Sequence, residues 1–292
     1  MDFGTIAHAL HDAQQRLVGS SPTPQLDARI LLAHILGFDQ AQLLAQRYAH
    51  LDHVKAERLN ALLERRAQGE PIAYLIGYRE FFGLRFAVDR RVLVPRPETE
   101  LLVELALAWL KHHHVAQPII ADIGTGSGCI AISLAHQIPH AHVYAIDLST
   151  DALAVARHNA ELHHVDSQLT FLHGNGVASL PQKVNLIVSN PPYTVLAEVD
   201  AGVYAFEPHL ALDGGSEGLD MYRWLIPACR EALDQSRPSA IMLEIGAWQG
   251  AAVCDLARQT FPHAQIDLHR DLAGHDRVVT IRLNETIKND DA

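Results

Sequence analysis

The sequence lacks an excess of positive charge. Its 292 residues carry 23 lysines and arginines against 34 aspartates and glutamates, a formal net charge of −11 with the 19 histidines neutral. Because nucleic-acid affinity depends on Lys and Arg contacts with phosphates, this balance argues against a protein that binds a polyanion. No apolar run approaches the roughly 20 residues that span a bilayer, and the first residues carry an acid rather than a basic cluster. We therefore expect a soluble, cytoplasmic protein with no membrane partner.

Cysteine is also scarce. Cys129, Cys229 and Cys254 are an odd number at wide spacing with no CxxC pair, so the sequence indicates neither a disulfide framework nor a zinc ribbon. A reducing compartment fits this usage. The consecutive histidines 112–114 do not share a helix face, as residues three or four apart do. We interpret them as a solvated helix end and expect no metal.

Hydrophobic periodicity divides the chain into two parts. Ordinary globular composition at this length is typical of about two domains. Residues 5–68 show helical spacing without strand signals, with Asp27 early in the second helix, where an acid favours the helix dipole. We expect residues 1–75 to form a small helical domain. Glycine and proline punctuate residues 76–98, which we interpret as a hairpin or linker, with strand-like alternation over 82–94.

From Pro118 onward, short β-rich runs alternate with helical ones. Strands that alternate with helices predict an α/β domain over residues 99–292, with a doubly wound, mostly parallel sheet. Continuous apolar strands predict helices on both faces. The seven expected strands lie within residues 118–124, 142–148, 169–175, 184–190, 240–246, 264–271 and 277–284.

A glycine turn follows the first of these strands. Residues 121–128, ADIGTGSG, open a helix at the carboxyl edge of the sheet, where ligands bind in open α/β sheets. Gly124, Gly126 and Gly128 allow close approach of the backbone to a ligand. The pattern GxGxG followed by Cys129 departs from the dinucleotide fingerprint, and a purely structural turn is the alternative.

Two acids specify the ligand further. Asp147 ends the second strand, 23 residues after Gly124, close to the position where an acid binds ribose hydroxyls in nucleotide folds. An adenosine-containing cofactor is therefore indicated. Asp122 adds a carboxylate that suits a positively charged ligand better than a pyrophosphate. S-adenosylmethionine, which has an ammonium and a sulfonium, meets both conditions.

A second motif, NPPY, follows the fourth strand. Asn190 accepts through its side-chain oxygen, Pro191 through its carbonyl, and Tyr193 offers a ring for stacking, while Pro192 helps to fix the backbone. Two acceptors that hold the hydrogens of a planar NH2 group would aim its lone pair at an electrophile. An ordinary Asn-Pro-Pro turn is the alternative.

Together these motifs resemble the bacterial release factor glutamine methyltransferases, the PrmC/HemK family, over nearly the whole chain. NPPY is shared with adenine-N6 DNA methyltransferases, and related ribosomal-protein glutamine methyltransferases typically carry PRSP. Here residues 95–98 read PRPE, which favours the release factor branch. The other matching stretches are LDARILLAHILG at 26–37, RRAQGEPIAYLIGYREFFGL at 65–84, FEPHLAL at 206–212 and DLAGHDRVV at 271–279.

The resemblance implies a helical amino-terminal domain that helps to bind the release factor, and a class I methyltransferase domain. It also implies transfer of a methyl group from S-adenosylmethionine to the amide nitrogen of the glutamine in the GGQ motif, leaving S-adenosylhomocysteine. Residues 190–193 would hold the glutamine. The residues expected to hold the cofactor are Asp122, Gly124, Thr125, Gly126, Ser127, Gly128, Asp147, Asn175 and Asn190.

The turn after the third strand departs from the family. Many members have an acid followed by an aromatic near the adenine, whereas this sequence reads His173, Gly174, Asn175, Gly176. Asn175 still offers an oxygen to adenine, but Gly176 supplies no ring. We expect weaker or differently oriented cofactor binding, unless another side chain covers the loss.

Other functions stay open from the residues alone. A DNA adenine methyltransferase needs the same acceptors for a flipped base, but the acidic balance argues against it. A non-catalytic adenosine sensor or translation-factor binding module would not need NPPY. Two interpretations of Glu98 and Glu100 stay open. Either acid could accept a proton, or both could be acids at a helix start after Pro97, and we assign no general base.

Overall fold

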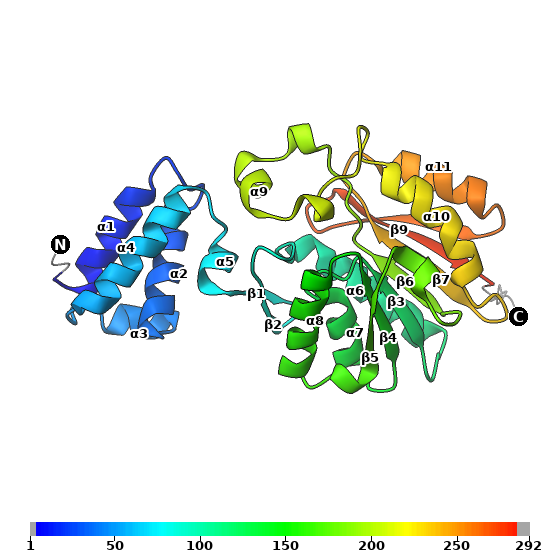
Figure 1. Cartoon of the computed structure of the whole chain (residues 1–292), viewed down its shortest axis with the longest axis horizontal. Coiled ribbons are helices and arrows are strands. Elements are labelled where there is room, and N and C mark those ends of the chain that lie inside the picture. Colours follow the sequence, from blue (N-terminus) through cyan, green and yellow to red (C-terminus); the bar gives the residue numbers. More distant parts are fainter. Residues whose placement is uncertain (1–3, 285–292) are drawn as a thin grey trace, which may run out of the picture. The chain divides into compact units, whose positions relative to one another are not determined.

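The computed structural model describes residues 4–284, so the outermost ends of the predicted domains, 1–3 and 285–292, lie outside the described residues. The chain divides into two compact units. The first runs up to Tyr78 and includes residues 200–206. The second contains residues 79–199 and the chain from Glu207 onward. Figure 1 colours the helices before Tyr78 blue to cyan.

The first unit is helical, as predicted for residues 5–68. Thr5 caps the first helix by accepting the backbone N–H of His8, and the second ends at Gly37, whose φ of 69° is left-handed. An added Cβ at Gly69 would lie 3.6 Å from Cα of Gly202, so residues 200–206 approach the chain that follows the fourth helix. The helices are α1 (Ile6–Leu17), α2 (Pro24–Leu36), α3 (Gln40–Ala45), α4 (His53–Ala67), α5 (Ile72–Ile76) and α9 (Ala201–Phe206).

A buried ion pair lies in the core of this unit. We expected Asp27 at the start of α2 because an acid there favours the helix dipole. Its side chain is only 4% exposed and accepts a hydrogen bond from Nε of Arg66 at 2.7 Å. It also accepts the hydroxyls of Ser21 and Thr23. The pattern of the first turn therefore identified the acid but missed its partner, because Arg66 comes from α4, far along the chain. A buried charge needs such partners to offset its desolvation.

The second unit is built on a seven-stranded sheet, and all seven predicted strands are confirmed. Their order is β5-β4-β3-β6-β7-β9-β8; β9 runs antiparallel to β7 and β8, and the other neighbouring pairs are parallel (Figure 1). The mostly parallel sheet is therefore also confirmed. The strands are β3 (Ile119–Ile123), β4 (His142–Asp147), β5 (Leu169–His173), β6 (Leu186–Ser189), β7 (Ser239–Glu244), β8 (Gln265–Arg270) and β9 (Asp276–Leu283).

Helices cover both faces of this sheet. Successive residues of β3 enter different cores: Ile120 packs with residues of α6 and α7, and Ala121 with residues of α10 and α11. This alternation explains why the strands are apolar throughout. The helices are α6 (Glu100–His112), α7 (Cys129–Gln137), α8 (Thr150–Leu162), α10 (Asp220–Ala232) and α11 (Gly250–Thr260). The short 3-10 helices are η1 (Pro97–Thr99), η2 (Asp166–Gln168), η3 (Gly176–Ser179), η4 (Leu196–Glu198) and η5 (His209–Ala211).

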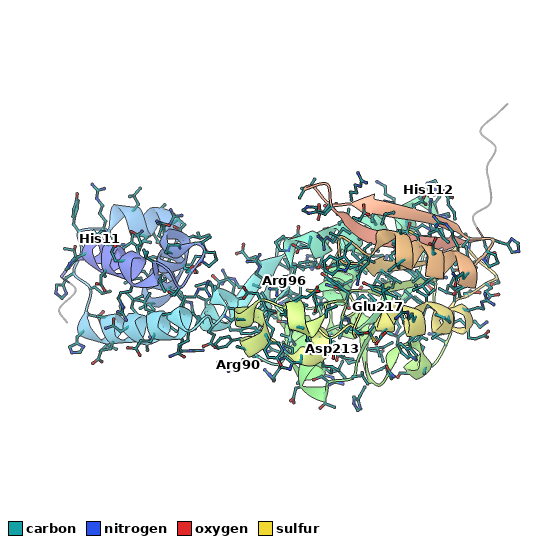
Figure 2. All side chains as sticks on the ribbon, turned by 90° about the horizontal axis from the view of Figure 1, so that it is seen from above. His11, Arg90, Arg96, His112, Asp213 and Glu217 are labelled. Carbon is teal, nitrogen blue, oxygen red and sulfur yellow. The ribbon has the colours of Figure 1, made fainter. Side chains whose placement is uncertain are left out.

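His112 ends α6 and is exposed (Figure 2). Within residues 4–284, no group of His, Cys, Asp and Glu side chains has an arrangement that would hold a metal ion. Across the same residues, no helix combines the length and the apolar character needed to cross a membrane.

A hairpin lies within residues 76–98, but it does not extend over the alternating residues 82–94. The strands are β1 (Tyr78–Phe81) and β2 (Leu84–Ala87), and the turn lies at Phe82 and Gly83, both with positive φ. The valines after β2 are buried without forming a strand. Their alternation therefore reflects packing of an irregular segment rather than strand pairing.

We expect Asp27→Asn to lower the free energy of unfolding by roughly 3–5 kcal/mol, because it leaves the buried Arg66 guanidinium without a counter-charge. Glu57→Gln removes the exposed partner of His53 in the same unit and should cost at most about 0.5 kcal/mol. Urea unfolding of the full chain, followed by circular dichroism, compares the two variants. Equal losses of stability would contradict the importance of the buried pair.

Candidate functional site

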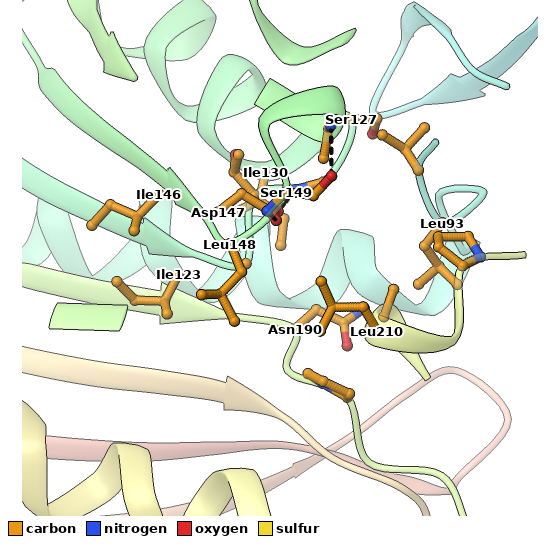
Figure 3. A pocket seen from close by; sticks show the side chains of 18 of the residues that line it. Leu93, Ile123, Ser127, Ile130, Ile146, Asp147, Leu148, Ser149, Asn190 and Leu210 are labelled. Carbon is orange, nitrogen blue, oxygen red and sulfur yellow. Dashed lines mark hydrogen bonds between the residues drawn. The ribbon is translucent and has the colours of Figure 1, made fainter. Parts of the chain in front are cut away.

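The carboxyl ends of four neighbouring strands build the site. β4, β3, β6 and β7 lie side by side and parallel, so the residues that follow them share one edge. A cavity of about 520 Å³ opens there (Figure 3). The sequence-predicted residues that line it are Gly124, Thr125, Gly126, Ser127, Asp147, Asn175, Asn190 and Pro192.

The glycine turn is bound to the end of β4. The backbone N–H groups of Gly124 and Thr125 both donate to the carbonyl of Ile146. Gly126 donates its N–H to Oδ2 of Asp147 at 2.9 Å, and Ser149 donates to Oδ1 at the same distance. All three glycines of the turn have positive φ, which explains the residue type. Asp147 thus both orders the turn and faces the cavity (Figure 3).

Asp122 lies behind the turn rather than on the cavity wall. It is fully buried, and its Oδ2 accepts the hydroxyl of Thr125 at 2.7 Å and the N–H of Ala131 at 3.2 Å. Burial raises the pKa of this carboxyl to about 7. Asp122 therefore connects β3, the turn and α7 from inside the protein.

Gly128 is also absent from the cavity wall. Its φ is 82°, and an added Cβ would lie 2.8 Å from Cδ1 of Ile132 and 3.2 Å from Cβ of Ala156. The third glycine is therefore required by close packing of the turn against α7 and α8, whereas Gly124 and Gly126 face the cavity.

A hydrogen bond orients the amide of Asn190. Its Nδ2 donates to Oγ1 of Thr99 at 3.2 Å, and the Thr99 side chain lies near the buried carboxyl of Glu244, whose pKa is raised by burial and lowered by Thr99. Since the nitrogen is held by Thr99, the carbonyl oxygen of Asn190 is the atom that this amide presents as an acceptor. Asn190 lines the cavity (Figure 3).

Glu244 also holds the rest of the NPPY segment. Tyr193 donates its hydroxyl to Oε1 of Glu244 at 3.1 Å, and Tyr222 donates to the Glu244 backbone carbonyl at 2.8 Å. Burial raises the pKa of Glu244 to about 7 and raises the pKa of Tyr193 above its ordinary value. Tyr193 and Pro191 are not among the residues that line the cavity. The tyrosine therefore anchors the segment from behind.

The PRPE segment is attached to the FEPHLAL segment. The buried carboxylate of Glu207 accepts hydrogen bonds from Nη2 of Arg96 at 2.6 Å and from the backbone N–H of Val94 at 3.0 Å. Arg96 is labelled in Figure 2 and lines the cavity. Glu98 lies in the first turn of η1 after Pro97, and Glu100 accepts the N–H of Phe82 at 2.8 Å. Both acids therefore lie at a helix start, and Glu100 also holds the turn between β1 and β2.

Several residues of the site were not predicted from the sequence. Glu244 carried a visible signal, since it is an acid at the end of an apolar strand on the same sheet edge. Thr99 and Glu207 lay in motifs that were recognised, but without a pattern that indicates their contacts. Trp224 lines the cavity from α10, and no sequence spacing links it to the site.

Comparison with known proteins agrees with this architecture. Residues 8–77 match the family model described as the PrmC N-terminal domain, and residues 99–205 match the methyltransferase small domain. The release factor glutamine methyltransferase of Moorella thermoacetica is 42% identical over 279 residues, covering 94% of this chain and 96% of the relative. The relative of the same name from Cereibacter sphaeroides is 42% identical, with 95% and 98% coverage. The crystal structure of a methyltransferase from Pyrococcus furiosus has a TM-score of 0.50 at 17% identity, covering 70% of this chain and 91% of that one.

The sheet order and the cavity at its carboxyl edge define a class I methyltransferase, with S-adenosylmethionine as the methyl donor. Identity above 40% over nearly the full length of several relatives is more specific. The chain belongs to the release factor glutamine methyltransferase family. The fold class and the family inferred from the sequence are both confirmed.

The buried carboxyl of Glu244 predicts a pH-dependent stability. Because burial raises its pKa from 4.5 to about 7, the folded state keeps a proton between these values that the unfolded state releases. The contribution of the neutral form is complete below pH 4.5 and is lost as the pH rises through 7. Glu244→Gln keeps an acceptor for Tyr193 but cannot ionise. As the pH rises from 5 to 8, its free energy of unfolding should therefore increase by roughly 1–3 kcal/mol relative to that of the wild type.

Denaturant unfolding of both proteins across this pH range measures the difference. Glu104→Gln, an exposed carboxyl on α6, is the matched control and should follow the wild type at every pH. A flat difference for Glu244→Gln would show that its carboxyl is ionised throughout.

Proposed function

We propose that this chain transfers a methyl group from S-adenosylmethionine to the side-chain amide nitrogen (N5) of the glutamine in the GGQ motif of peptide chain release factors. The observation that carries the proposal is the oriented amide of Asn190, which presents its oxygen to the same cavity as Asp147 and the glycine turn. The names of relatives that are 42% identical over nearly the whole chain support the substrate.

The residues around the cavity fit the cofactor. Each carboxylate oxygen of Asp147 accepts one backbone N–H and retains a second acceptor site, which suits the two hydroxyls of a ribose. Gly124 is exposed, and an added Cβ there would meet nothing within 4 Å, so a ligand can approach the backbone. The cavity of about 520 Å³ lies within the usual range of about 300–1,000 Å³ for small-molecule sites.

S-adenosylmethionine, when bound, supplies a methyl group on a positively charged sulfonium, which becomes a neutral thioether after displacement. The chain supplies alignment. Oδ1 of Asn190, which lines the cavity, accepts an N–H group of the substrate amide and so helps to aim its nitrogen lone pair at the methyl carbon. Such alignment accounts for about 7–11 kcal/mol of the barrier in favourable reactions. The excess proton passes to solvent as or after the C–N bond forms, and we assign no side chain as its acceptor.

The helical unit is the proposed docking element for the release factor. Residues 8–77 match a domain model of this family, and the unit exposes large apolar side chains, notably Leu44, Tyr48 and Val54. Exposed apolar side chains of this size are common in surfaces that bind other proteins. Under this proposal the first unit selects the protein substrate, and the second carries out the transfer.

Mass spectrometry of purified release factor tests the reaction directly. After incubation with the chain and S-adenosylmethionine, we expect one added methyl group, located on the GGQ glutamine by peptide sequencing. Plasmid DNA serves as a parallel acceptor. Methylation of DNA adenine without methylation of the factor would refute the proposal. Absence of methylation on both acceptors would also refute it.

Asn190→Ala should lower kcat by about 100-fold or more, since it removes an oriented acceptor that acts on the attacking amide. Binding of S-adenosylhomocysteine, measured by calorimetry, should change by less than about threefold because the cofactor contacts of Asp147 and the turn remain. Gln259→Ala removes an exposed amide on α11 and should leave both quantities unchanged. Normal turnover in Asn190→Ala would exclude the assigned role.

Asp147→Asn should act on affinity instead. It removes one charged acceptor, and the affinity for S-adenosylhomocysteine should fall about 10- to 100-fold, as expected for a hydrogen bond to a charged group. At saturating cofactor kcat should change much less, because a ribose contact is made equally in the ground and transition states. Asp151→Asn, at an exposed position of α8, is the control. A fall in kcat alone would reassign Asp147 to the chemical step.

A further inference from the structure

The turn after β5 is packed against a tryptophan. Gly176 is buried, has a φ of 58° and lines the cavity. An added Cβ at this position would lie 2.3 Å from Cη2 and 2.8 Å from Cζ3 of Trp224. The indole therefore occupies the space that a side chain at position 176 would need. Glycine at this position is required by the ring beside it as well as by its backbone conformation.

Helix α10 brings this ring to the cavity. Tyr222, Leu225 and Ile226 are buried in the core on one face of the sheet. Met221 and Trp224, three residues apart on the helix, both line the cavity. Trp224 remains 37% exposed, although it is the kind of side chain that the core would otherwise bury. One side of α10 thus stabilises the sheet while another presents an indole to the site.

The position of the ring relative to Asp147 indicates which ligand group it meets. Asp147 ends β4, and the 175–176 turn follows β5, the strand paired with β4. If Asp147 binds the ribose, the base attached to that ribose extends toward a neighbouring strand end. On the β5 side, Asn175 offers an amide for the edge of a base, and Trp224 offers an aromatic face.

We propose that Trp224 is a nucleoside-binding residue, whose indole stacks on the adenine of the cofactor in place of a side chain at position 176. The inference rests on the proposed use of S-adenosylmethionine and specifies how this chain holds it. The missing aromatic in the HGNG turn is then supplied by α10, so the weaker binding expected from Gly176 does not follow. Stacking on a tryptophan face favours any adenosine compound, whether or not it carries a methyl group.

Calorimetric titration with S-adenosylhomocysteine, and separately with adenosine, tests the stacking. Trp224→Ala should weaken binding of both probes by about the same factor, roughly 5- to 100-fold, because both carry the base. Trp224→Phe keeps an aromatic face and should weaken binding by less than about threefold. Trp248→Phe, at a tryptophan that is 64% exposed and does not line the cavity, should bind like the wild type. Circular dichroism confirms that each variant is folded.

Tryptophan fluorescence distinguishes direct stacking of the base on Trp224 from a purely structural role of this residue. A base stacked on Trp224 should change the emission of the wild type and of Trp248→Phe, but not that of Trp224→Phe. A change that persists in Trp224→Phe at saturating ligand would overturn the inference.

Gly176→Ala tests the same contact from the glycine side. Its methyl group would push the indole from its position, so we expect at least a threefold loss of affinity in the wild-type background and a smaller loss in Trp224→Ala, where only the backbone strain remains. Equal losses in both backgrounds, or normal affinity in Trp224→Ala, would refute the role of Trp224 while the proposed methyl transfer stands. Failure of the wild type to bind S-adenosylhomocysteine would instead refute the proposed function and the inference together.

Discussion

The fully buried carboxyl group of Glu244 supports the NPPY segment from behind the cavity. At the end of β7 its side chain accepts a hydrogen bond from the Tyr193 hydroxyl, and its backbone carbonyl accepts one from the Tyr222 hydroxyl. An acid with no exposure is costly to bury, and the contacts that offset this cost are the ones that set the conformation of the NPPY segment. The conformation of the NPPY segment therefore depends on a residue that does not line the cavity.

Within the site, several residues that face the cavity are held by residues that lie behind them. Asp122 and Gly128 support the glycine turn from inside, as Glu244 supports NPPY and Glu207 supports Arg96. Preorganised groups of this kind do not have to be reoriented when a ligand binds, which favours alignment as the source of rate enhancement.

The sequence predicted most of the fold because the strands are strongly apolar and regularly spaced. All seven strands of the main sheet were located, as were the two motifs that meet at its edge. The extent of the hairpin was misjudged because buried valines in an irregular segment alternate like a strand. Contacts between residues far apart in the chain were also missed. Asp27 pairs with Arg66, and Trp224 packs on Gly176. Periodicity reports which side of an element is apolar, but it carries no information about which distant residue lies opposite.

Residues 200–206 cluster with the first unit although the chain on both sides of them belongs to the second. The polypeptide therefore passes between the units three times, after Tyr78, after Val199 and after Phe206. A protein with one linker can be cut into two independent pieces, but this chain cannot. Cleavage after Tyr78 would leave the larger fragment with a segment, α9, whose packing partners near Gly69 had been removed. Replacement of the first unit of this chain by that of another protein would therefore have to include α9 as well as the residues before Tyr78.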